Sequence, residues 1–370
     1  MRNVPRLRFP EFKGEWRKIN LESIAPNISA GKDTSKNGIY KLYGSTGVIG
    51  TTDIATYKGE IVLVARVGAN AGLIQLVNDE FGVTDNTLVV NAHDNNRYIY
   101  YYLQHYNLNR LVFGSGQPLI TGGMLKKVSI GFSNDCAEKN KIVKLLSLLD
   151  KRIATQNKII EDLKKLKVAI SNRLLNNKTL LNKTAPLSKF GDLKNGYAFK
   201  SSAYVPNGNY NIITIANVSG DREIVTDNCN TISSVPTDIQ SHQVLKSSDI
   251  LISLTGNVGR VSLNKGNNNL LNQRVGLFVP NNSISSEFLY QTLSFVQFEN
   301  SMINLAQGAA QLNIAKGDVE SYQVRYSENE HLISQITQIL LGYDKKIEIE
   351  NKYLQSLLAQ KSYLLSNMFI

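Results

Sequence analysis

The segment LLDKRIATQNKIIEDL at residues 148–163 returns far along the chain as GYDKKIEIENKYLQSL at residues 342–357. Asp150 corresponds to Asp344 at a separation of 194 residues, and the same separation joins the other matching positions. Around the first segment, apolar residues alternate at steps of four and three, which is typical of a heptad seam along an α-helix. The shared separation therefore predicts two long amphipathic helices that are copies of one another.

Polar side chains interrupt both seams at matching positions. Gln156 and Lys167 stand within the first seam, and Glu350 and Lys361 hold the equivalent places in the second. A helix with so long an apolar stripe needs a partner, and the other copy is the simplest one. Two unrelated surface helices would not share both the separation and the interruptions. The residues predicted to form the helix-pair interface are Ile142, Leu146, Leu149, Ile153, Ile160, Leu163, Ile170, Ile336, Leu340, Tyr343, Ile347, Leu354, Leu357 and Leu364.

The segments before each helix are repeated more loosely. EIVLVARVGANAGLI from Glu60 is matched by DILISLTGNVGRVSL from Asp249, and each predicts a strand that ends in a glycine-spaced turn. YIYYYLQ from Tyr98 and FLYQTLS from Phe288 predict a helix in each half. An Asn/Lys/Thr-rich linker with a break at Pro186 joins the halves of this duplicated α+β protein. The predicted boundaries are a globular domain at 1–136, a helix at 137–178, a globular domain at 179–327 and a helix at 328–370.

The charge of the chain is unevenly distributed. The net charge is +11, and residues 137–178 hold 11 Lys or Arg against 4 Asp or Glu, whereas residues 179–370 hold 15 of each kind. A basic protein favours a polyanionic partner, most often nucleic acid, although basic residues can also serve solubility alone. No apolar run approaches the roughly 18 residues of a membrane span. The first residues lack the apolar stretch of a signal peptide, so we expect a soluble cytoplasmic protein with no membrane partner.

Motifs for catalysis and metal binding are scarce. Cys136 and Cys229 form no CxxC pair, and the four histidines lack metal-ligand spacing. VFGSGQP from Val112 is similar to the F-x-G-x-G loop with which adenine methyltransferases bind S-adenosylmethionine. However, no N-P-P-[YFW] tetrapeptide occurs, and the second half carries QGAAQ instead. We therefore expect no catalytic residue, no metal site and no cofactor on this chain, and a fused DNA methyltransferase remains an alternative.

Polar side chains gather around the two glycine-spaced turns, VGANAG and TGNVGR. The backbone N–H groups of such turns can hold a phosphate, and Arg, Asn and Gln can bond base edges through two atoms at once. Ordinary polar loops are the alternative for any single residue. The candidate DNA contacts are Arg66, Asn70, Asn86, Gln117, Lys200, Asn257, Arg260, Gln273, Arg274, Gln311 and Asn313.

The order of these segments resembles the specificity subunit of type I restriction-modification systems over nearly the whole chain. The opening PRLRFPEFKGEWRK from Pro5 is similar to the typical start of that family, and GDLKNGYAFKSS from Gly191 is similar to the start of one of its target-recognition domains. LLSLLDKRI and LLGYDKKI resemble its two conserved helical regions.

The resemblance implies a non-catalytic subunit with two target-recognition domains, each reading one half of a split, asymmetric site in double-stranded DNA. It also implies that the two helices form an antiparallel coiled coil that sets the spacing and recruits two modification (methyltransferase) subunits. Those subunits are expected to bind S-adenosylmethionine, and restriction (motor-nuclease) subunits are expected to join the complex. A coiled-coil adaptor without a DNA role, whose domains bind proteins or glycans, remains the alternative from another functional class.

Overall fold

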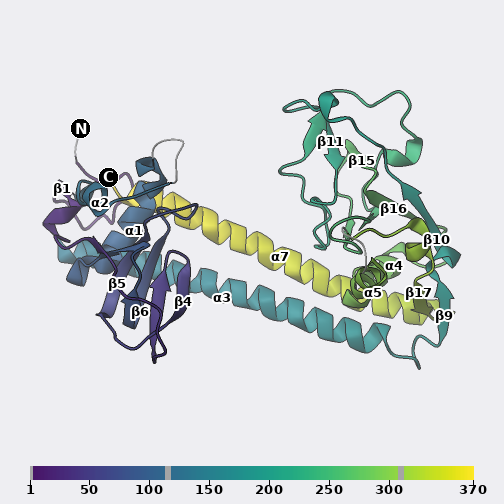
Figure 1. Cartoon of the computed structure of the whole chain (residues 1–370), viewed down its shortest axis with the longest axis horizontal. Helices are drawn as coiled ribbons and strands as arrows, with labels where there is room; N and C mark the ends of the chain where they lie inside the picture. Colours follow the sequence, from purple (N-terminus) through teal and green to yellow (C-terminus); the bar gives the residue numbers. More distant parts are fainter. Residues whose placement is uncertain (1–2, 113–117, 307–311) are drawn as a thin grey trace. The chain divides into compact units, whose positions relative to one another are not determined.

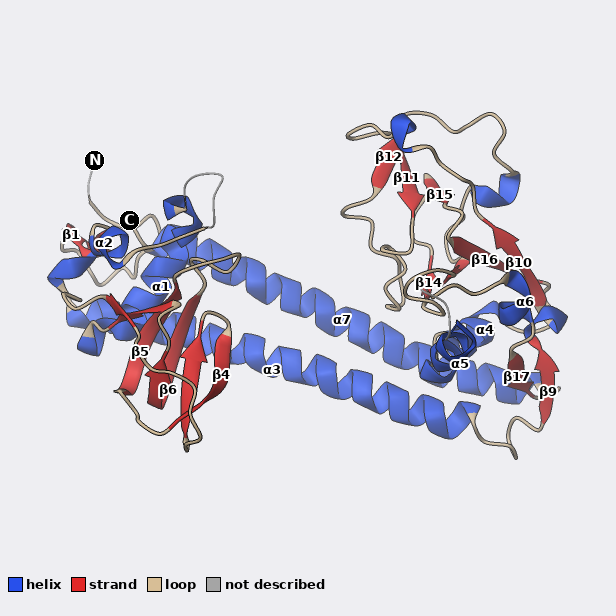
Figure 2. Ribbon diagram, viewed as in Figure 1, coloured by secondary structure: helices blue, strands red, loops and turns tan. Residues whose placement is uncertain are grey.

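The chain is built from helices and β-sheets that occur together in each half (Figure 2). The computed structural model describes residues 3–112, 118–306 and 312–370. This mixture of elements confirms the predicted α+β class. Among the described residues, none of the helices combines the length and the apolar character that crossing a bilayer requires.

The chain divides into two compact units, and only the N-terminal one is formed by two separate segments of the sequence. The N-terminal unit comprises residues 1–158 and 352–370, and the C-terminal unit comprises residues 159–351. The boundary falls inside both long helices, α3 (Cys136–Leu175) and α7 (Glu330–Met368) (Figure 1). Each unit therefore contains the beginning of one long helix and the end of the other.

The N-terminal unit is centred on a six-stranded sheet with the strand order β2-β7-β5-β6-β3-β4. Helix α1 (Asn96–Tyr106) packs on β5 and β6, and its buried face places Tyr98, Ile99 and Leu103 in one core with Val62 and Val64 of β5. A separate two-stranded sheet pairs β1 with β8. The bounds are β1 (Arg17–Asn20), β2 (Ser29–Ala30), β3 (Tyr40–Gly44), β4 (Gly47–Thr52), β5 (Tyr57–Ala65), β6 (Ile74–Val83), β7 (Thr87–Val90), α2 (Gly122–Lys126) and β8 (Ser129–Phe132).

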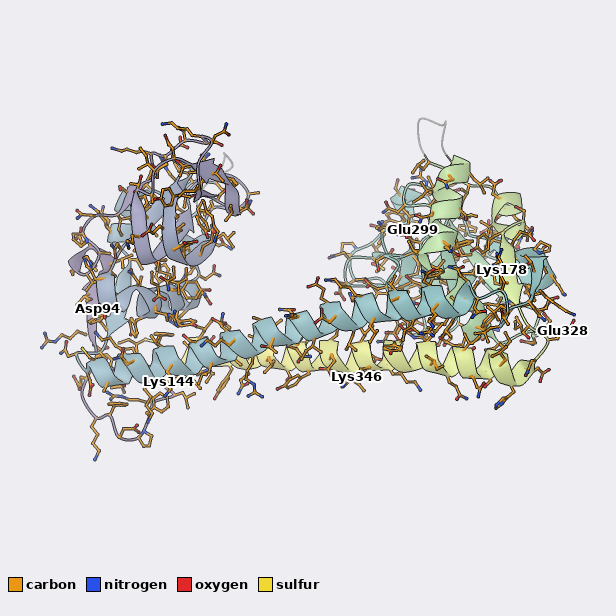
Figure 3. All side chains as sticks on the ribbon, turned by 90° about the horizontal axis from the view of Figure 1, so that it is seen from below. Asp94, Lys144, Lys178, Glu299, Glu328 and Lys346 are labelled. Carbon is orange, nitrogen blue, oxygen red and sulfur yellow. The ribbon has the colours of Figure 1, made fainter. Side chains whose placement is uncertain are left out.

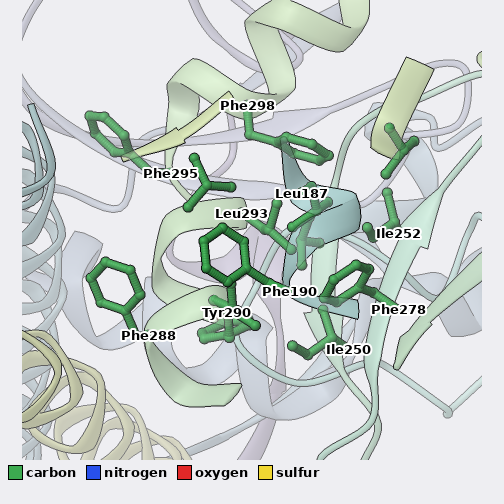
Figure 4. Packing of buried hydrophobic residues seen from close by; sticks show 14 of the residues in the cluster. Leu187, Phe190, Ile250, Ile252, Phe278, Phe288, Tyr290, Leu293, Phe295 and Phe298 are labelled. Atoms are coloured by element: carbon green, nitrogen blue, oxygen red, sulfur yellow. The ribbon is translucent and has the colours of Figure 1, made fainter. Parts of the chain in front are cut away.

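The C-terminal unit contains a four-stranded sheet, β10-β16-β13-β14, and a three-stranded sheet, β12-β11-β15. Its main core contains a group of aromatic side chains, with Phe190, Phe278, Phe288, Tyr290 and Phe298 in one buried cluster (Figure 4). The bounds are β9 (Lys183–Pro186), β10 (Gly191–Asn195), β11 (Tyr210–Ile213), β12 (Asn230–Ile232), β13 (Ile250–Ser253), β14 (Val261–Leu263), β15 (Asn269–Leu271), β16 (Val275–Pro280), α4 (Ser286–Leu293), α5 (Val296–Ala306), α6 (Lys316–Glu320) and β17 (Gln323–Tyr326).

Both long helices begin with the same capping arrangement. The Asp135 carboxylate accepts from the backbone N–H of Glu138 at 3.3 Å, and the Asn329 side chain accepts from the N–H of Leu332 at 3.1 Å. Asp135 N–H donates to the hydroxyl of Ser133 at 3.1 Å, and Asn329 N–H donates to Ser327 at 3.2 Å. Such caps satisfy the free N–H groups of a first helical turn. The repeat seen in the sequence therefore extends to the residues that start each helix.

The far end of each long helix lies in a hydrophobic core. At the end of α3, Leu175 is buried in the main core of the C-terminal unit. Directly after α7, Phe369 is buried in the N-terminal unit, with its ring centroid 5.5 Å from those of both Tyr98 and Tyr102. Charged residues such as Lys144 on α3 and Lys346 on α7 are exposed (Figure 3). Each long helix therefore has a buried apolar side and an exposed charged side.

The predicted interface residues are distributed over both units. In the N-terminal unit, Ile142, Leu146, Leu149, Leu357 and Leu364 belong to one buried cluster, and Ile153 packs against it. In the C-terminal unit, Ile336 and Leu340 belong to another cluster, and Ile170 packs against it. Ile160 is buried, and Leu163, Tyr343, Ile347 and Leu354 are half-buried. A continuous coiled coil through all of these positions stays a prediction.

The linker after the first long helix differs from the sequence prediction. Helix α3 ends at Leu175, and the expected break at Pro186 is instead the last residue of β9, which pairs with β17. Proline removes a backbone donor but is tolerated at the end of a strand that has no second neighbour. The Asn/Lys/Thr-rich segment is therefore only partly a linker, because its last part already belongs to the C-terminal unit.

Candidate nucleic-acid interface

Three segments of the N-terminal unit meet where β5 ends. Arg66 N–H donates to the carbonyl of Asn86 at 2.9 Å, and the Arg66 carbonyl accepts from Ile120 N–H at 2.8 Å. Gly68 N–H donates to the carbonyl of Pro118 at 3.0 Å. We call residues 66–72, 84–86 and 118–120 the N-terminal junction. These bonds hold together a glycine turn, the residues just before β7 and the segment 118–120 at one end of the sheet.

The C-terminal unit repeats this arrangement bond for bond. Leu254 N–H donates to the carbonyl of Arg274 at 3.0 Å, and the Leu254 carbonyl accepts from Ile314 N–H at 2.9 Å. Gly256 N–H donates to the carbonyl of Leu312 at 2.9 Å. We call residues 254–260, 272–274 and 312–314 the C-terminal junction. The two junctions share one backbone design, although their sequences differ.

Both glycine turns depend on left-handed backbone. The φ angles are 79° and 93° at Gly68 and Gly72, and 73° and 78° at Gly256 and Gly259. Side chains other than glycine rarely adopt such angles without cost. At Gly259 the space is also closed, because a Cβ would lie 2.7 Å from the Cβ of Met302 on α5. The glycines therefore allow each turn to expose an asparagine that lies between them, Asn70 in one unit and Asn257 in the other.

Replacing Gly259 by alanine is expected to destabilise the C-terminal unit by more than the backbone term of about 1–2 kcal/mol, because the new methyl group also meets Met302. Gly266→Ala is the matched control, since Gly266 has a φ of 81° but nothing within 4 Å of an added Cβ. Amide hydrogen exchange of β13 and β14 measures both losses. Equal losses in the two variants would contradict a role for Met302 in closing the turn.

In the N-terminal unit, three predicted contact residues do lie together at the junction. Arg66 is half-buried, and its Nη1 atom lies 3.5 Å from the carbonyl oxygen of Asp85. Asn70 and Asn86 are exposed on the turn and at the start of β7. The remaining candidate, Gln117, lies outside the described residues. The guanidinium and the two amides are thus available on one surface of this unit.

In the C-terminal unit, Asn257, Arg260, Arg274 and Asn313 belong to the junction. The Asn313 side-chain carbonyl accepts from the Thr255 hydroxyl at 2.8 Å, which fixes the orientation of the amide. Arg260 forms an ion pair with Glu299 of α5 at 3.3 Å, so its charge is partly neutralised. Arg274 is exposed, and its guanidinium forms no hydrogen bond or ion pair with the described residues. Arg274 is therefore the least compensated charge of this junction.

Gln273 also belongs to this junction, whereas Lys200 lies outside it. Gln273 is exposed, and its backbone N–H donates to the carbonyl of Tyr197 at 2.9 Å. Lys200 lies three residues after Tyr197 and lines a separate groove of about 380 Å³ with Phe199 and Pro236. Gln311 lies outside the described residues. The structure therefore places Lys200 away from the other candidates, and contact of any of them with DNA stays a prediction.

Equivalent positions of the two junctions carry different side chains. The position of Arg66 is taken by Leu254, and that of Asn86 is taken by Arg274. The backbone bridge between Val67 and Leu119 is repeated between Thr255 and Asn313. The two junctions therefore combine a common backbone with different polar side chains.

The sequence prediction missed a group of amides beside the N-terminal junction. An open groove of about 430 Å³ next to the glycine turn is lined by Asn70, Gln104, Asn107 and Asn109. Asn107 ends α1 in left-handed backbone with a φ of 59°, which turns the chain back toward the glycine turn. The signal in the sequence is the pair of asparagines directly after the tyrosine-rich helix. Asn107 and Asn109 therefore extend the candidate surface of this unit.

The chemistry of both junctions is that of recognition. Arginine and the amides donate to and accept from base edges, and exposed backbone turns can approach phosphates. Within residues 3–112, 118–306 and 312–370, no group of three or more His, Cys, Asp or Glu side chains could hold a metal ion. The polar groups described here are thus suited to binding a polyanion.

Comparison with known proteins agrees with this description. The family model described as the type I restriction modification DNA specificity domain matches residues 13–165 and again residues 182–359. The MjaVIII specificity subunit of Methanocaldococcus jannaschii, a type I restriction enzyme subunit, is 26% identical over 351 residues, covering 82% of this chain and 80% of the relative. The EcoprrI specificity subunit of Escherichia coli is 28% identical over 136 residues, covering 34% of this chain and 33% of that subunit.

Solved structures show the same fold. The S subunit of the type I restriction-modification system of M. genitalium superposes with a TM-score of 0.63 at 19% identity and covers 99% of both chains. A chain from a structure of type I restriction-modification complex assembly gives a TM-score of 0.52 at 14% identity, covering 98% of both chains. The family match spans both halves of the chain, each with its own junction. The chain therefore belongs to the type I restriction-modification DNA specificity family, as a specificity subunit.

Proposed function

We propose that this specificity subunit reads a split, asymmetric site in double-stranded DNA, with one half-site at each junction. The observation that carries the proposal is the shared backbone of the two junctions combined with their different side chains. Two identical readers would favour a palindrome, whereas Arg66 and Asn86 in one unit and Arg274 and Asn313 in the other favour two different half-sites. The proposed recognition domains comprise residues 1–136 and 179–327.

The long helices are proposed to act as a spacer. We infer that α3 and α7 pack antiparallel as a coiled coil and hold the two recognition domains apart. Half-sites read from one face of B-DNA lie about 34–36 Å, or a multiple of this distance, apart. A helix of 40 residues is about 60 Å long at about 1.5 Å per residue, so it can span such a separation.

The partners follow from the same function. We propose that the helices recruit two modification (methyltransferase) subunits that carry S-adenosylmethionine, and that restriction (motor-nuclease) subunits complete the complex on DNA in the cytoplasm. The chain itself is proposed to be non-catalytic. Residues 179–370 have no net charge, so the modification subunits are expected to supply much of the contact with phosphates.

Exchange of one recognition domain tests the proposal. The chain is co-expressed with its modification subunits, and methylated sites are read by modification-sensitive sequencing. Replacing residues 1–136 with the corresponding domain of a relative is expected to change one half of the motif and leave the other half unchanged. Replacing residues 179–327 is expected to do the reverse. A palindromic motif, or a change in both halves after a single exchange, would refute two-domain reading.

A further inference from the structure

An aspartate of α3 connects three helices within the N-terminal unit. Asp150 Oδ1 forms an ion pair with Nζ of Lys361 on α7 at 2.7 Å. The other carboxylate oxygen accepts from the hydroxyl of Tyr101 on α1 at 2.8 Å, and this hydroxyl also lies 3.1 Å from Oγ of Ser147. Burial raises the pKa of Tyr101, so its hydroxyl remains a proton donor. The Asp150 carboxylate therefore connects α1 to both long helices, α3 and α7.

The equivalent aspartate of α7 does the same within the C-terminal unit. Asp344 Oδ1 pairs with Nζ of Lys167 on α3 at 2.5 Å. Its other oxygen accepts from the amide of Gln291 on α4 at 2.6 Å and from Arg222 Nη1 at 3.1 Å. Arg222 also forms a two-bond ion pair with Glu287 of α4, at 2.7 and 2.6 Å. Asp344 is only 7% exposed, and its charged partners Lys167 and Arg222 are partly buried, at 18% and 26% exposed.

The two networks are copies with exchanged helices. Lys167 and Lys361 are the polar interruptions of the two seams, and each pairs with the aspartate of the opposite helix. The long helix that supplies the aspartate in one unit supplies the lysine in the other. Tyr101 and Gln291 then link each aspartate to the first helix of the globular part. The lysines thus interrupt the apolar seams at the positions where each domain is attached.

Each network favours one arrangement of the helices that it joins. A partly buried ion pair such as Asp150–Lys361 or Asp344–Lys167 contributes little net stability compared with an apolar contact, but it favours the one register in which its partners meet. A slide of one heptad, about 10 Å along the helix, would separate each aspartate from its lysine. Burial opposes the charge of Arg222, yet its hydrogen bonds to Glu287 and the charge of Asp344 raise its pKa. The arrangement therefore specifies geometry more than it adds affinity.

We propose that Asp150 and Asp344 are positioning residues that fix the orientation of each recognition domain on the helix pair, and thereby the length of the spacer between the half-sites. This inference rests on the proposed reading of a split site. Neither aspartate belongs to a junction, so their loss leaves the groups that face the bases in place. The half-site sequences and the spacer length are thus controlled by different residues.

The test uses the full chain assembled with its modification subunits. Asp150→Asn and Asp344→Asn remove the charges at constant size, and Tyr101→Phe removes only the hydroxyl that ties α1 to Asp150. Asp162→Asn is the control, because Asp162 is an exposed acid on the same helix as Asp150. Two measurements are made, hydrogen exchange of α1 and α4, and the distribution of spacer lengths among methylated sites on random DNA.

For Asp150→Asn and Tyr101→Phe we expect exchange of α1 to accelerate about tenfold, the gain corresponding to one lost charged hydrogen bond. For Asp344→Asn we expect the same in α4. Both half-site sequences should be kept, while spacers one base pair longer or shorter become methylated. The Asp162→Asn variant should match the wild type in both measurements.

Unchanged exchange, or faster exchange with an unchanged spacer, would overturn the inference. The wild-type complex distinguishes failure of this inference from failure of the proposed function on which it rests. If the wild-type complex yields no split motif, two-half reading fails and so does the control of spacing. The exchange measurement then still decides whether the aspartates hold α1 and α4 on the long helices.

Discussion

Replacing Glu138 by alanine should lower the unfolding free energy of the N-terminal unit by about 3–5 kcal/mol, the range for removing one partner of a buried ion pair. The Glu138 side chain is fully buried and accepts from Arg8 Nε at 2.6 Å, from Trp16 Nε1 at 3.1 Å and from Ser133 Oγ at 2.6 Å. Alanine would leave all three donors without their acceptor, and the charge of Arg8, only 15% exposed, would lose its partner.

Urea unfolding followed by tryptophan fluorescence measures this loss directly. Trp16 is the single tryptophan of the chain and is 2% exposed, so its emission reports on the N-terminal unit alone. Glu11→Ala is the control, because Glu11 also pairs with a basic residue of α3, Lys141, but is exposed. Exposed pairs contribute little, so the control should leave the unfolding midpoint nearly unchanged. Similar midpoints for both variants would show that the buried pair does not anchor the first residues of the chain.

Replacing Arg274 by alanine should reduce discrimination in one half of the methylated motif by about 1–3 kcal/mol, a factor of roughly 5 to 150. The backbone of Arg274 is fixed in the C-terminal junction by the bond from Leu254 at 3.0 Å, while its side chain is exposed. The substitution therefore removes a reading group without disturbing its support. The effect is measured by letting oligonucleotides that differ at single positions compete for methylation by the complex at constant salt.

Lys246→Ala provides the comparison. Lys246 is another exposed cation of the C-terminal unit, but it precedes β13, whereas the junction follows the end of that strand. Its loss should leave the motif unchanged. Equal loss of discrimination in both halves of the site after Arg274→Ala would argue for a general electrostatic role. A loss confined to one half assigns Arg274 to base recognition in that half.

The helices and the duplication could be predicted because their signals are periodic. Lys167 and Lys361 interrupt seams that otherwise hold many apolar residues, and tertiary packing cannot easily override such a pattern. The glycine turns at Gly68 and Gly256 were also readable, because a left-handed position selects one residue type. Local patterns of this kind specify local structure well.

Features that depend on contacts far apart in sequence could not be predicted. Glu138 reads as an ordinary helix acid, and only the fold brings Arg8 and Trp16 to it. By residue type Lys200 is as good a candidate for DNA contact as the junction residues, yet it lines a different groove. Asn107 follows a predicted helix, where asparagine is common for reasons of backbone geometry alone, so its residue type does not point to a binding surface. In each case residue type was visible, but spatial neighbours were not.

The burial of Phe369 beside Tyr98 and Tyr102 has a consequence for biosynthesis. The N-terminal unit needs residues 352–370, so it cannot be completed while residues 159–351 are still being translated. At about 5–20 residues per second, the ribosome needs roughly 10–40 s for that interval. During this time the apolar stripe of α3 and the site that later holds Phe369 are uncovered. We expect the nascent chain to recruit holding chaperones during this interval, and expression to depend on translation rate more strongly than for a protein whose domains close in order.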